Sequence, residues 1–198
     1  SNPLEGERRG GTVGFPLPGT GVRVVGEDDV PLSAGGIGHI QVRGDNVFAG
    51  YWGMPEKTRE EFTADGFFRT GDMGRFDADG YLAIIGRDKD LIISGGLNVY
   101  PKEIEEAIDA LPGVAESAVI GVPHPDFGEA VTAVVVPGRD ASGLTAEGII
   151  AALKGQIAGF KVPKVVHFVD DLPRNAMGKV QKNRLRERFG DAGKSQPP

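Results

Sequence analysis

Glycine-rich turns between short apolar runs limit the possible folds of this chain more than any other sequence feature. Glycine makes up 31 of the 198 residues, about twice the ~7% share usual in globular proteins. The glycines follow no G-X-Y period, so a fibrous collagen-like protein is excluded. The hydrophobic content of 39% is sufficient for a packed core. The sequence therefore predicts a loop-rich α+β protein.

The first part of the chain, residues 1–88, is rich in predicted strands. Three short strands are expected, at 22–25, 37–43 and 46–52. A hairpin is expected over 66–86, because Asp77-Ala78-Asp79-Gly80 has the composition of a tight turn. One short helix is expected over 55–62 and begins at Pro55, since proline is favoured in the first helical turn.

The pattern changes after Arg87. The clearest helix is expected over 101–111, where Ile104, Ile108 and Leu111 share one face. Pro112-Gly113 follows the helix and ends it. Further strands are expected at 91–93, 117–122, 130–136 and 165–169, and further helices from Thr145 and over 180–189. The sequence of residues 89–198 thus predicts a compact domain of three helices on a small sheet, with a disordered tail at 192–198.

Composition excludes several functions. The chain has no cysteine, so disulfides, thiolate metal sites and cysteine nucleophiles are absent. His39, His124 and His167 are scattered without the spacing of metal ligands. No apolar run approaches the ~20 residues of a membrane span, and no signal peptide is visible. The net charge of −6 argues against general nucleic-acid binding. We expect a soluble cytoplasmic protein with no metal site, nucleic-acid partner or membrane partner.

Positive charge is concentrated near the end of the chain. Between Lys161 and Arg188 there are eight cationic and three acidic residues, a local charge of +5. A basic segment of this kind is consistent with a solvated helix or with a surface that meets phosphate groups.

Three motifs carry the functional information. They are FRTGDMG at 68–74, GRDKDLIISGGLNVYPKEIEE at 86–106 and PRNAMGKVQKNRL at 173–185. Each motif is weak alone, but the three in this order are specific. Together they resemble the adenylate-forming enzymes, which include acyl-CoA synthetases, luciferases and the adenylation domains of peptide synthetases. The opening SNPLEGERRGGTVGFPLPGTGVRVV, with GDNVFAGYWGMPEKTREEF, looks most like the malonyl-CoA synthetases.

The resemblance has implications for domain organisation. It implies that residues 1–88 are the C-terminal part of the large adenylation domain and that residues 89–198 are the small C-terminal lid domain. The family's phosphate loop and its adenine- and magnesium-binding motif do not occur in this sequence. We expect both to lie upstream, together with the Mg²⁺ ligands and most of the acid pocket, and we expect these 198 residues alone to be inactive.

The resemblance also assigns an ATP site. Asp72 matches the family aspartate that accepts hydrogen bonds from the ribose hydroxyls, a role that suits a carboxylate. Arg87 matches the arginine near the ribose and phosphates, and Lys179 matches the catalytic adenylation lysine. The alternative roles are structural: a turn aspartate, an arginine in a surface ion pair and a solvated loop lysine.

Other residues match the hinge and CoA regions of the family. Lys89 falls at the hinge position, or is a solvated loop lysine. Ser94, Gly95 and Gly96 match the loop that lines the pantetheine tunnel, where glycine leaves room for a narrow chain. Phe160 and Lys161 are expected to face the CoA nucleotide, although Phe160 is equally compatible with core packing.

The implied activity is that of an ATP-dependent, AMP-forming acyl-CoA synthetase. Its substrates would be ATP, CoA and a small carboxylate such as malonate. Arg8 and Arg9 are candidate contacts for a second carboxylate, or are a solvated pair of loop arginines. Two alternatives stay open: an adenylation domain with a carrier-protein acceptor, and a non-enzymatic lid or binding domain. A protein acetyltransferase acting on Lys179 is a further implied partner, because related synthetases with a PxxxxGK stretch are switched off in this way.

Overall fold

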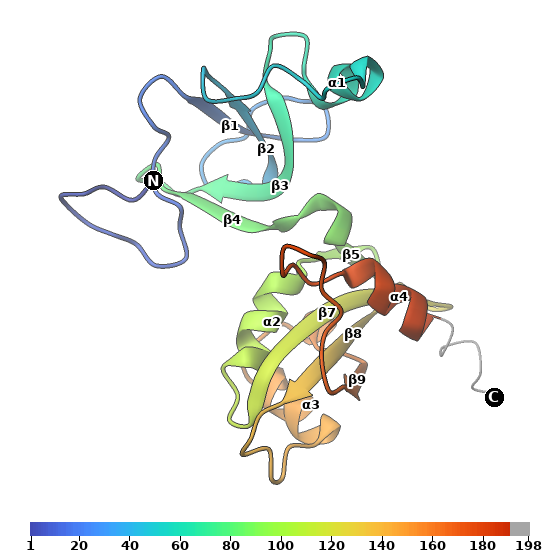
Figure 1. Ribbon diagram of the computed structural model, residues 1–198. Helices are drawn as coiled ribbons and strands as arrows, with labels where there is room; N and C mark the ends of the chain where they lie inside the picture. Colours follow the sequence, from blue (N-terminus) through green and yellow to red (C-terminus); the bar gives the residue numbers. More distant parts are fainter. Residues whose placement is uncertain (191–198) are drawn as a thin grey trace. The chain divides into compact units, whose positions relative to one another are not determined.

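A computed structural model describes residues 1–190 (Figure 1), so the expectation of a disordered tail at 192–198 lies outside the described residues. The chain divides into two compact units, Ser1–Lys89 and the part from Asp90 onward. Within residues 1–190, every helix is too short or too polar to cross a membrane.

The first unit is built on a four-stranded antiparallel sheet. Its strands lie in the order β1 (Gly21–Val25), β2 (Gly38–Arg43), β3 (Phe68–Phe76) and β4 (Leu82–Arg87). Val24, Ile40 and Leu82 form its small apolar core. The helix α1 (Pro55–Glu61) has no buried side chain, so the sheet contributes most of this unit's packing. β3 curves strongly (Figure 1), and its pairing with β4 shifts register between Met73 and Gly74.

The strand expected at 46–52 is absent from the structure. The chain turns instead, and the Val47 amide donates to the Gly44 carbonyl at 3.0 Å. Gly50 has a φ of +153°, and a Cβ there would lie 2.6 Å from the Thr58 side chain. The Phe48 ring packs edge-on against three other aromatic rings, those of Tyr51, Phe62 and Phe68. The apolar residues that suggested a strand therefore serve an aromatic cluster in a loop.

The second unit is organised around one long hairpin. β7 (Val114–His124) and β8 (Gly128–Pro137) pair antiparallel over ten residue pairs. β9 (Val165–Phe168) adds parallel to β8, and β5 (Ile92–Ser94) joins β8 through the Ser94–Gly128 pair. β6 (Leu97–Val99), which the sequence analysis did not predict, completes the sheet beside β5. The 3₁₀ turns are η1 (Asp88–Asp90) and η2 (Gly159–Lys161), which precede β5 and β9.

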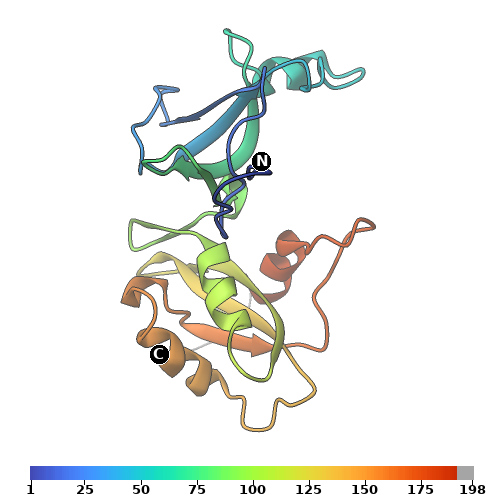
Figure 2. The same cartoon turned by 90° about the vertical axis from the view of Figure 1, so that its left-hand side faces the viewer.

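Three helices cover the two faces of this sheet. Ile104 and Ile108 of α2 (Pro101–Asp109) share a buried core with Ile149 and Leu153 of α3 (Ala146–Lys154). Leu185 of α4 (Lys182–Gly190) packs on the opposite face. Figure 1 shows α2 and α4 on opposite sides of β7 and β8, and α2 lies in front of the strands in Figure 2. The predicted α+β class, with three helices on a small sheet, is confirmed.

Candidate functional site

Asp72 and Arg87 are direct neighbours in the first unit. They occupy paired positions on β3 and β4, and Arg87 Nε lies 2.7 Å from Asp72 Oδ1. The Asp72 side chain is 23% exposed and the Arg87 side chain 49%, so both groups reach solvent. The sheet register thus brings together two residues that stand 15 positions apart in the sequence.

The conformation before Asp72 is fixed locally. Gly71 has a φ of +70°, which favours glycine. The Thr70 hydroxyl donates to the Ile40 carbonyl at 2.8 Å and accepts from the Asp72 amide at 3.1 Å. The run Thr70-Gly71-Asp72 is therefore held against β2.

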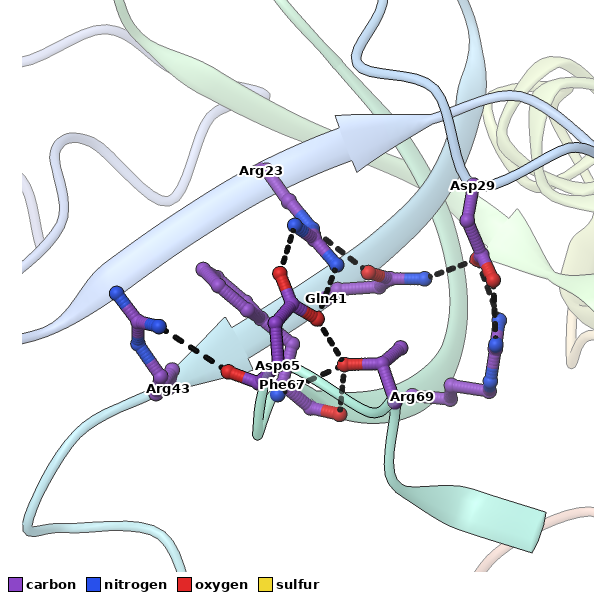
Figure 3. A network of polar contacts seen from close by, with 8 residues as sticks. Arg23, Asp29, Gln41, Arg43, Asp65, Phe67 and Arg69 are labelled. Atoms are coloured by element: carbon purple, nitrogen blue, oxygen red, sulfur yellow. Dashed lines mark hydrogen bonds and ion pairs between the residues drawn. The ribbon is translucent and has the colours of Figure 1, made fainter.

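A polar network supports the same strand (Figure 3). Arg69, which directly precedes Thr70, donates to both carboxylate oxygens of Asp29, at 2.6 and 2.5 Å. The fully buried Gln41 donates to Asp29 at 2.6 Å and accepts from Arg23 at 2.8 Å. Arg23 also donates to both oxygens of Asp65, at 2.7 and 3.1 Å. Because side chains of β1, β2 and β3 all take part, the network holds β3 in register beside Asp72.

A polar hollow of about 630 Å³ adjoins these residues within the first unit. Its lining includes Thr70, Gly71 and Arg87, together with Lys57 and Lys89. Acidic side chains also line it, namely Glu27, Asp29, Glu61 and Asp88. The hollow is large enough for a small polar ligand and carries both signs of charge.

Lys179 belongs to the second unit and is exposed. It lies in a tight hairpin that is closed by an antiparallel bridge between Arg174 and Val180. Among residues 1–190, no carboxylate forms an ion pair with its ammonium group. The predicted catalytic lysine is thus accessible to an anionic ligand.

Lys89 is exposed within η1 and is the last residue of the first unit. The next residue, Asp90, pairs with Arg186 of α4 at 3.0 Å and so is tied to the second unit. Lys89 therefore stands where the chain passes from one compact unit to the other.

The residues expected at the CoA face lie on two segments. Gly95 and Gly96 form the β5–β6 turn with φ of +58° and +77°, while Ser94 is buried. The Gly95 amide donates to the Phe127 carbonyl at 2.8 Å, which joins this turn to the β7–β8 loop. The turn is thus bare of side chains at two successive positions and anchored beside an aromatic residue.

Phe160 and Lys161 lie on η2 and differ in availability. Phe160 is 38% exposed, so it is not a core residue. Lys161 Nζ lies 2.8 and 2.7 Å from the two carboxylate oxygens of Glu103 on α2. A phosphate would have to displace this ion pair. The exposed Lys164 is freer, and its amine lies 5.3 Å from the centre of the Phe127 ring.

The sequence analysis did not single out Phe127 as a residue beside the glycine turn. Its ring lies 4.8 Å from that of His124, and 38% of the residue is exposed. The only signal for it was a single aromatic residue in the Gly- and Pro-rich loop GVPHPDFGE.

Arg9 is not free to hold a second substrate carboxylate. Its guanidinium contacts Glu7, Asp77 and Asp79 at 2.9, 2.7 and 2.8 Å and stacks on Tyr81 at 4.4 Å. These acidic neighbours, chiefly the hydrogen-bonded Glu7, raise the pKa of Arg9 further above its usual value. Arg9 therefore anchors the N-terminal loop to the β3–β4 turn.

Residues 1–190 contain no group of three or more His, Asp or Glu side chains placed to hold a metal ion.

Two family models match parts of this chain. The family described as AMP-binding enzyme matches residues 1–52, and the AMP-binding enzyme C-terminal domain matches residues 103–179. The chain therefore belongs to the adenylate-forming superfamily of AMP-binding enzymes.

Individual relatives share the fold at high identity. The crystal structure of ATP-bound MatB from Rhodopseudomonas palustris is 59% identical with a TM-score of 0.91, covering 97% of this chain and 38% of that one. Feruloyl-CoA synthase of Amycolatopsis sp is 47% identical over 91% of this chain and 36% of its own length. The amide bond synthetase McbA of Marinactinospora thermotolerans is 37% identical with a TM-score of 0.85, covering 90% of this chain and 36% of that one. The chain thus spans about a third of the length of the curated relatives it matches.

The network of Figure 3 predicts a specific acid sensitivity. The hydrogen bond from Arg23, and then that from Thr63, lowers the pKa of Asp65 to about 2. In the unfolded chain an aspartate titrates near ~3.9. Because the folded-state pKa is lower, the stabilisation by Asp65 is present above pH ~4 and is lost as the pH falls towards 2. In urea unfolding followed by circular dichroism, Asp65→Asn should be less stable than wild type at pH 7, and the gap should narrow between pH 4 and pH 2.

Asp45→Asn, at an exposed aspartate outside the network, is the matched control. Its stability to urea should depend on pH as that of the wild type does. A constant difference between Asp65→Asn and wild type across this pH range would refute the assignment.

Proposed function

We propose that this chain is the C-terminal part of an ATP-dependent, AMP-forming acyl-CoA synthetase, an acid–thiol ligase. The observation that carries the proposal is Lys179, which is exposed, has no ion-pair partner among residues 1–190 and lies on a hairpin fixed by its own hydrogen bonds. The sequence identity of 59% to the ATP-bound MatB and of 47% to a feruloyl-CoA synthase supports the proposal. Residues 1–88 would complete the large adenylation domain and residues 89–198 would form the lid domain, in keeping with the compact units that meet at Lys89 and Asp90.

The first step would form an acyl-adenylate. A carboxylate oxygen attacks the α-phosphorus of ATP, and the bond from that phosphorus to the leaving pyrophosphate breaks. All reacting groups are anionic, so a fixed cation at the point of attack lowers the barrier. Lys179 is the candidate for this cation.

Asp72 and Arg87 would hold the nucleotide. The Asp72 carboxylate has about four acceptor positions, so it can receive ribose hydroxyls while Arg87 keeps its contact with Oδ1. Arg87 would thereby orient Asp72 and meet phosphate or hydroxyl oxygens with its remaining N–H groups. The Mg²⁺ ligands are proposed to lie in the family's adenine- and magnesium-binding motif, which this sequence does not contain.

The second step would transfer the acyl group to CoA. The CoA thiol attacks the acyl carbonyl, and AMP leaves. Gly95 and Gly96 lack side chains where the pantetheine arm would pass, beside the buried Ser94. Phe160 and Lys161 would face the nucleotide end of CoA. Lys164 is the less encumbered cation, since Lys161 is paired with Glu103.

The acid substrate is proposed to be malonate or a short related acid. The resemblance of the chain's opening to malonyl-CoA synthetases and the 59% identity to MatB support this choice. The enzyme would act in the cytoplasm and serve fatty acid metabolism.

Loss of Lys179 should separate the two steps. In the whole protein at its natural length, Lys179→Ala should lower pyrophosphate release by ~10²–10³-fold, the scale of removing one preorganised charge-stabilising group. Thioester formation from a supplied acyl-adenylate should persist, because that step does not need the cation at the α-phosphate. Lys154→Ala, at an exposed lysine on α3, is the control. Equal loss in both half-reactions would remove Lys179 from the adenylation site.

Lys89 is proposed as the hinge about which the small domain rotates between adenylate formation and thioester formation. Lys89→Pro fixes φ near −65°, so adenylation should persist while CoA transfer falls. Lys89→Ala removes the charge but keeps backbone freedom, and it should transfer the acyl group at close to the wild-type rate. Transfer at the wild-type rate by Lys89→Pro would show that the pivot lies elsewhere.

Lys179 is also proposed as a target of a protein lysine acetyltransferase, since it is exposed and unpaired among residues 1–190. Acetylation removes the charge and should block adenylation. Peptide mass spectrometry after incubation with acetyl-CoA and a protein acetyltransferase should find the modification, with activity falling in parallel. An unmodified Lys179, or full adenylation despite stoichiometric acetylation, would exclude this regulation.

A further inference from the structure

We propose that Asn175 is a positioning residue for Lys179, and that its side-chain amide oxygen sets the backbone conformation that presents the lysine. This inference rests on the proposed role of Lys179 and extends it to a second residue. The two side chains do not share a hydrogen bond, so Asn175 would act on the reaction only through the backbone that carries Lys179.

One residue supplies most of the hydrogen bonds in this turn. Asn175 Oδ1 accepts from the amides of Met177 and Lys179, at 3.0 and 2.9 Å. The Asn175 amide donates to the Lys179 carbonyl, and its carbonyl accepts from the Gly178 amide, both at 2.9 Å. Gly178 adopts a φ of +78°, which closes the turn at a position that favours glycine. Four hydrogen bonds of Asn175 thus enclose the Lys179 backbone.

The base of the hairpin is anchored separately. Arg174 donates to the Gly178 carbonyl at 2.7 Å, and its guanidinium forms an ion pair with Glu116 on β7. The backbone amide of Gln181 donates to the Pro173 carbonyl at 2.7 Å. The two strands of the hairpin are therefore held whether or not the Asn175 side chain is present.

The segment after the hairpin has its own anchor. Lys182 Nζ lies 2.7 Å from Glu105 Oε1 of α2, and only 16% of the Lys182 side chain is exposed. The same Glu105 oxygen accepts from the Val119 amide at 2.7 Å. Since both ends of the hairpin are tied to the second unit, removal of the Asn175 side chain should loosen the tip alone.

A loose tip would matter because the position of the cation decides its effect. Displacement of a reacting group by ~1 Å can cost ~10²-fold in rate. Lysine reaches its ligand through a flexible stem, so a fixed backbone is the main means of directing it. The expected defect is therefore in the rate of adenylation, whereas ground-state binding of ATP, which Asp72 and Arg87 are proposed to provide, should change little.

The test compares Asn175→Ala with Asn175→Asp in the whole protein. Asn175→Ala should lower kcat for pyrophosphate release by ~10–100-fold, with KM for ATP within about twofold of wild type and thioester formation from supplied acyl-adenylate retained. Asn175→Asp keeps an oxygen acceptor at the same place and should restore most of the rate. Ala176→Ser, at an exposed neighbour in the same turn, is the matched control.

A second readout follows the turn directly. Hydrogen exchange at the Met177 and Lys179 amides should be about fivefold or more faster in Asn175→Ala, the scale of one lost hydrogen bond. Exchange at the Gln181 amide should not change, since that bond belongs to the base of the hairpin.

The outcomes separate this inference from the proposed function. If Lys179→Ala loses adenylation but Asn175→Ala keeps the full rate, the positioning role is overturned and the proposed function stands. Equal loss of both half-reactions in Asn175→Ala, or no recovery in Asn175→Asp, would also overturn it. A wild-type protein that forms no adenylate from malonate or other short acids would overturn both.

Discussion

The antiparallel pairing of β7 with β8 is the constraint on which the second unit depends. Because successive side chains of a strand point to opposite faces, Val119 and Val131 enter the core beneath α2 and α3, while Ile120 and Val134 enter the core beneath α4. A shift of register by one residue would exchange the two sets. β7 also carries the polar anchors of the hairpin that contains Lys179. Glu116 of β7 pairs with Arg174, and the Val119 amide of β7 donates to Glu105. The hairpin that carries Lys179 is therefore anchored through β7 to the central sheet of the second unit.

Much of this architecture could be predicted from local sequence patterns. The spacing of Ile104, Ile108 and Leu111 indicated α2, and the turn Asp77–Gly80 indicated the β3–β4 hairpin. These features depend on residues close together in the sequence. The strand predicted at 46–52 was wrong. Phe48 of this segment packs against the rings of Phe62 and Phe68, and the segment does not pair with a neighbouring strand. β6 has only three residues and was too short to stand out beside a glycine turn.

The side-chain contacts around the candidate site residues could not be predicted from the sequence. The motifs made Asp72 and Arg87 candidates, and the strand register places them beside each other as an ion pair. The bond between Gln41 and Asp29 and the pairing of Lys161 with Glu103 link residues that are far apart in the sequence. No local pattern encodes such contacts, because they depend on the packing of separate elements. Asn175 was visible within PRNAMGK, yet its role depends on where its amide oxygen points.

The proposed chemistry sets two requirements that the molecule meets in different ways. A nucleotide held by Asp72 and Arg87 requires a rigid support, and the buried Gln41 and the Arg69–Asp29 pair provide it within the sheet of the first unit. The proposed cation, Lys179, would act in adenylation but not in thioester formation. Its support must therefore be rigid and must belong to a different unit from the nucleotide site. The Lys179 hairpin has this property, because its hydrogen bonds are local and its anchors, Glu105 and Glu116, lie in the second unit. Preorganisation of the cation is then compatible with a change of pose at Lys89, since no hydrogen bond of the hairpin has to break for the backbone at Lys89 to rotate.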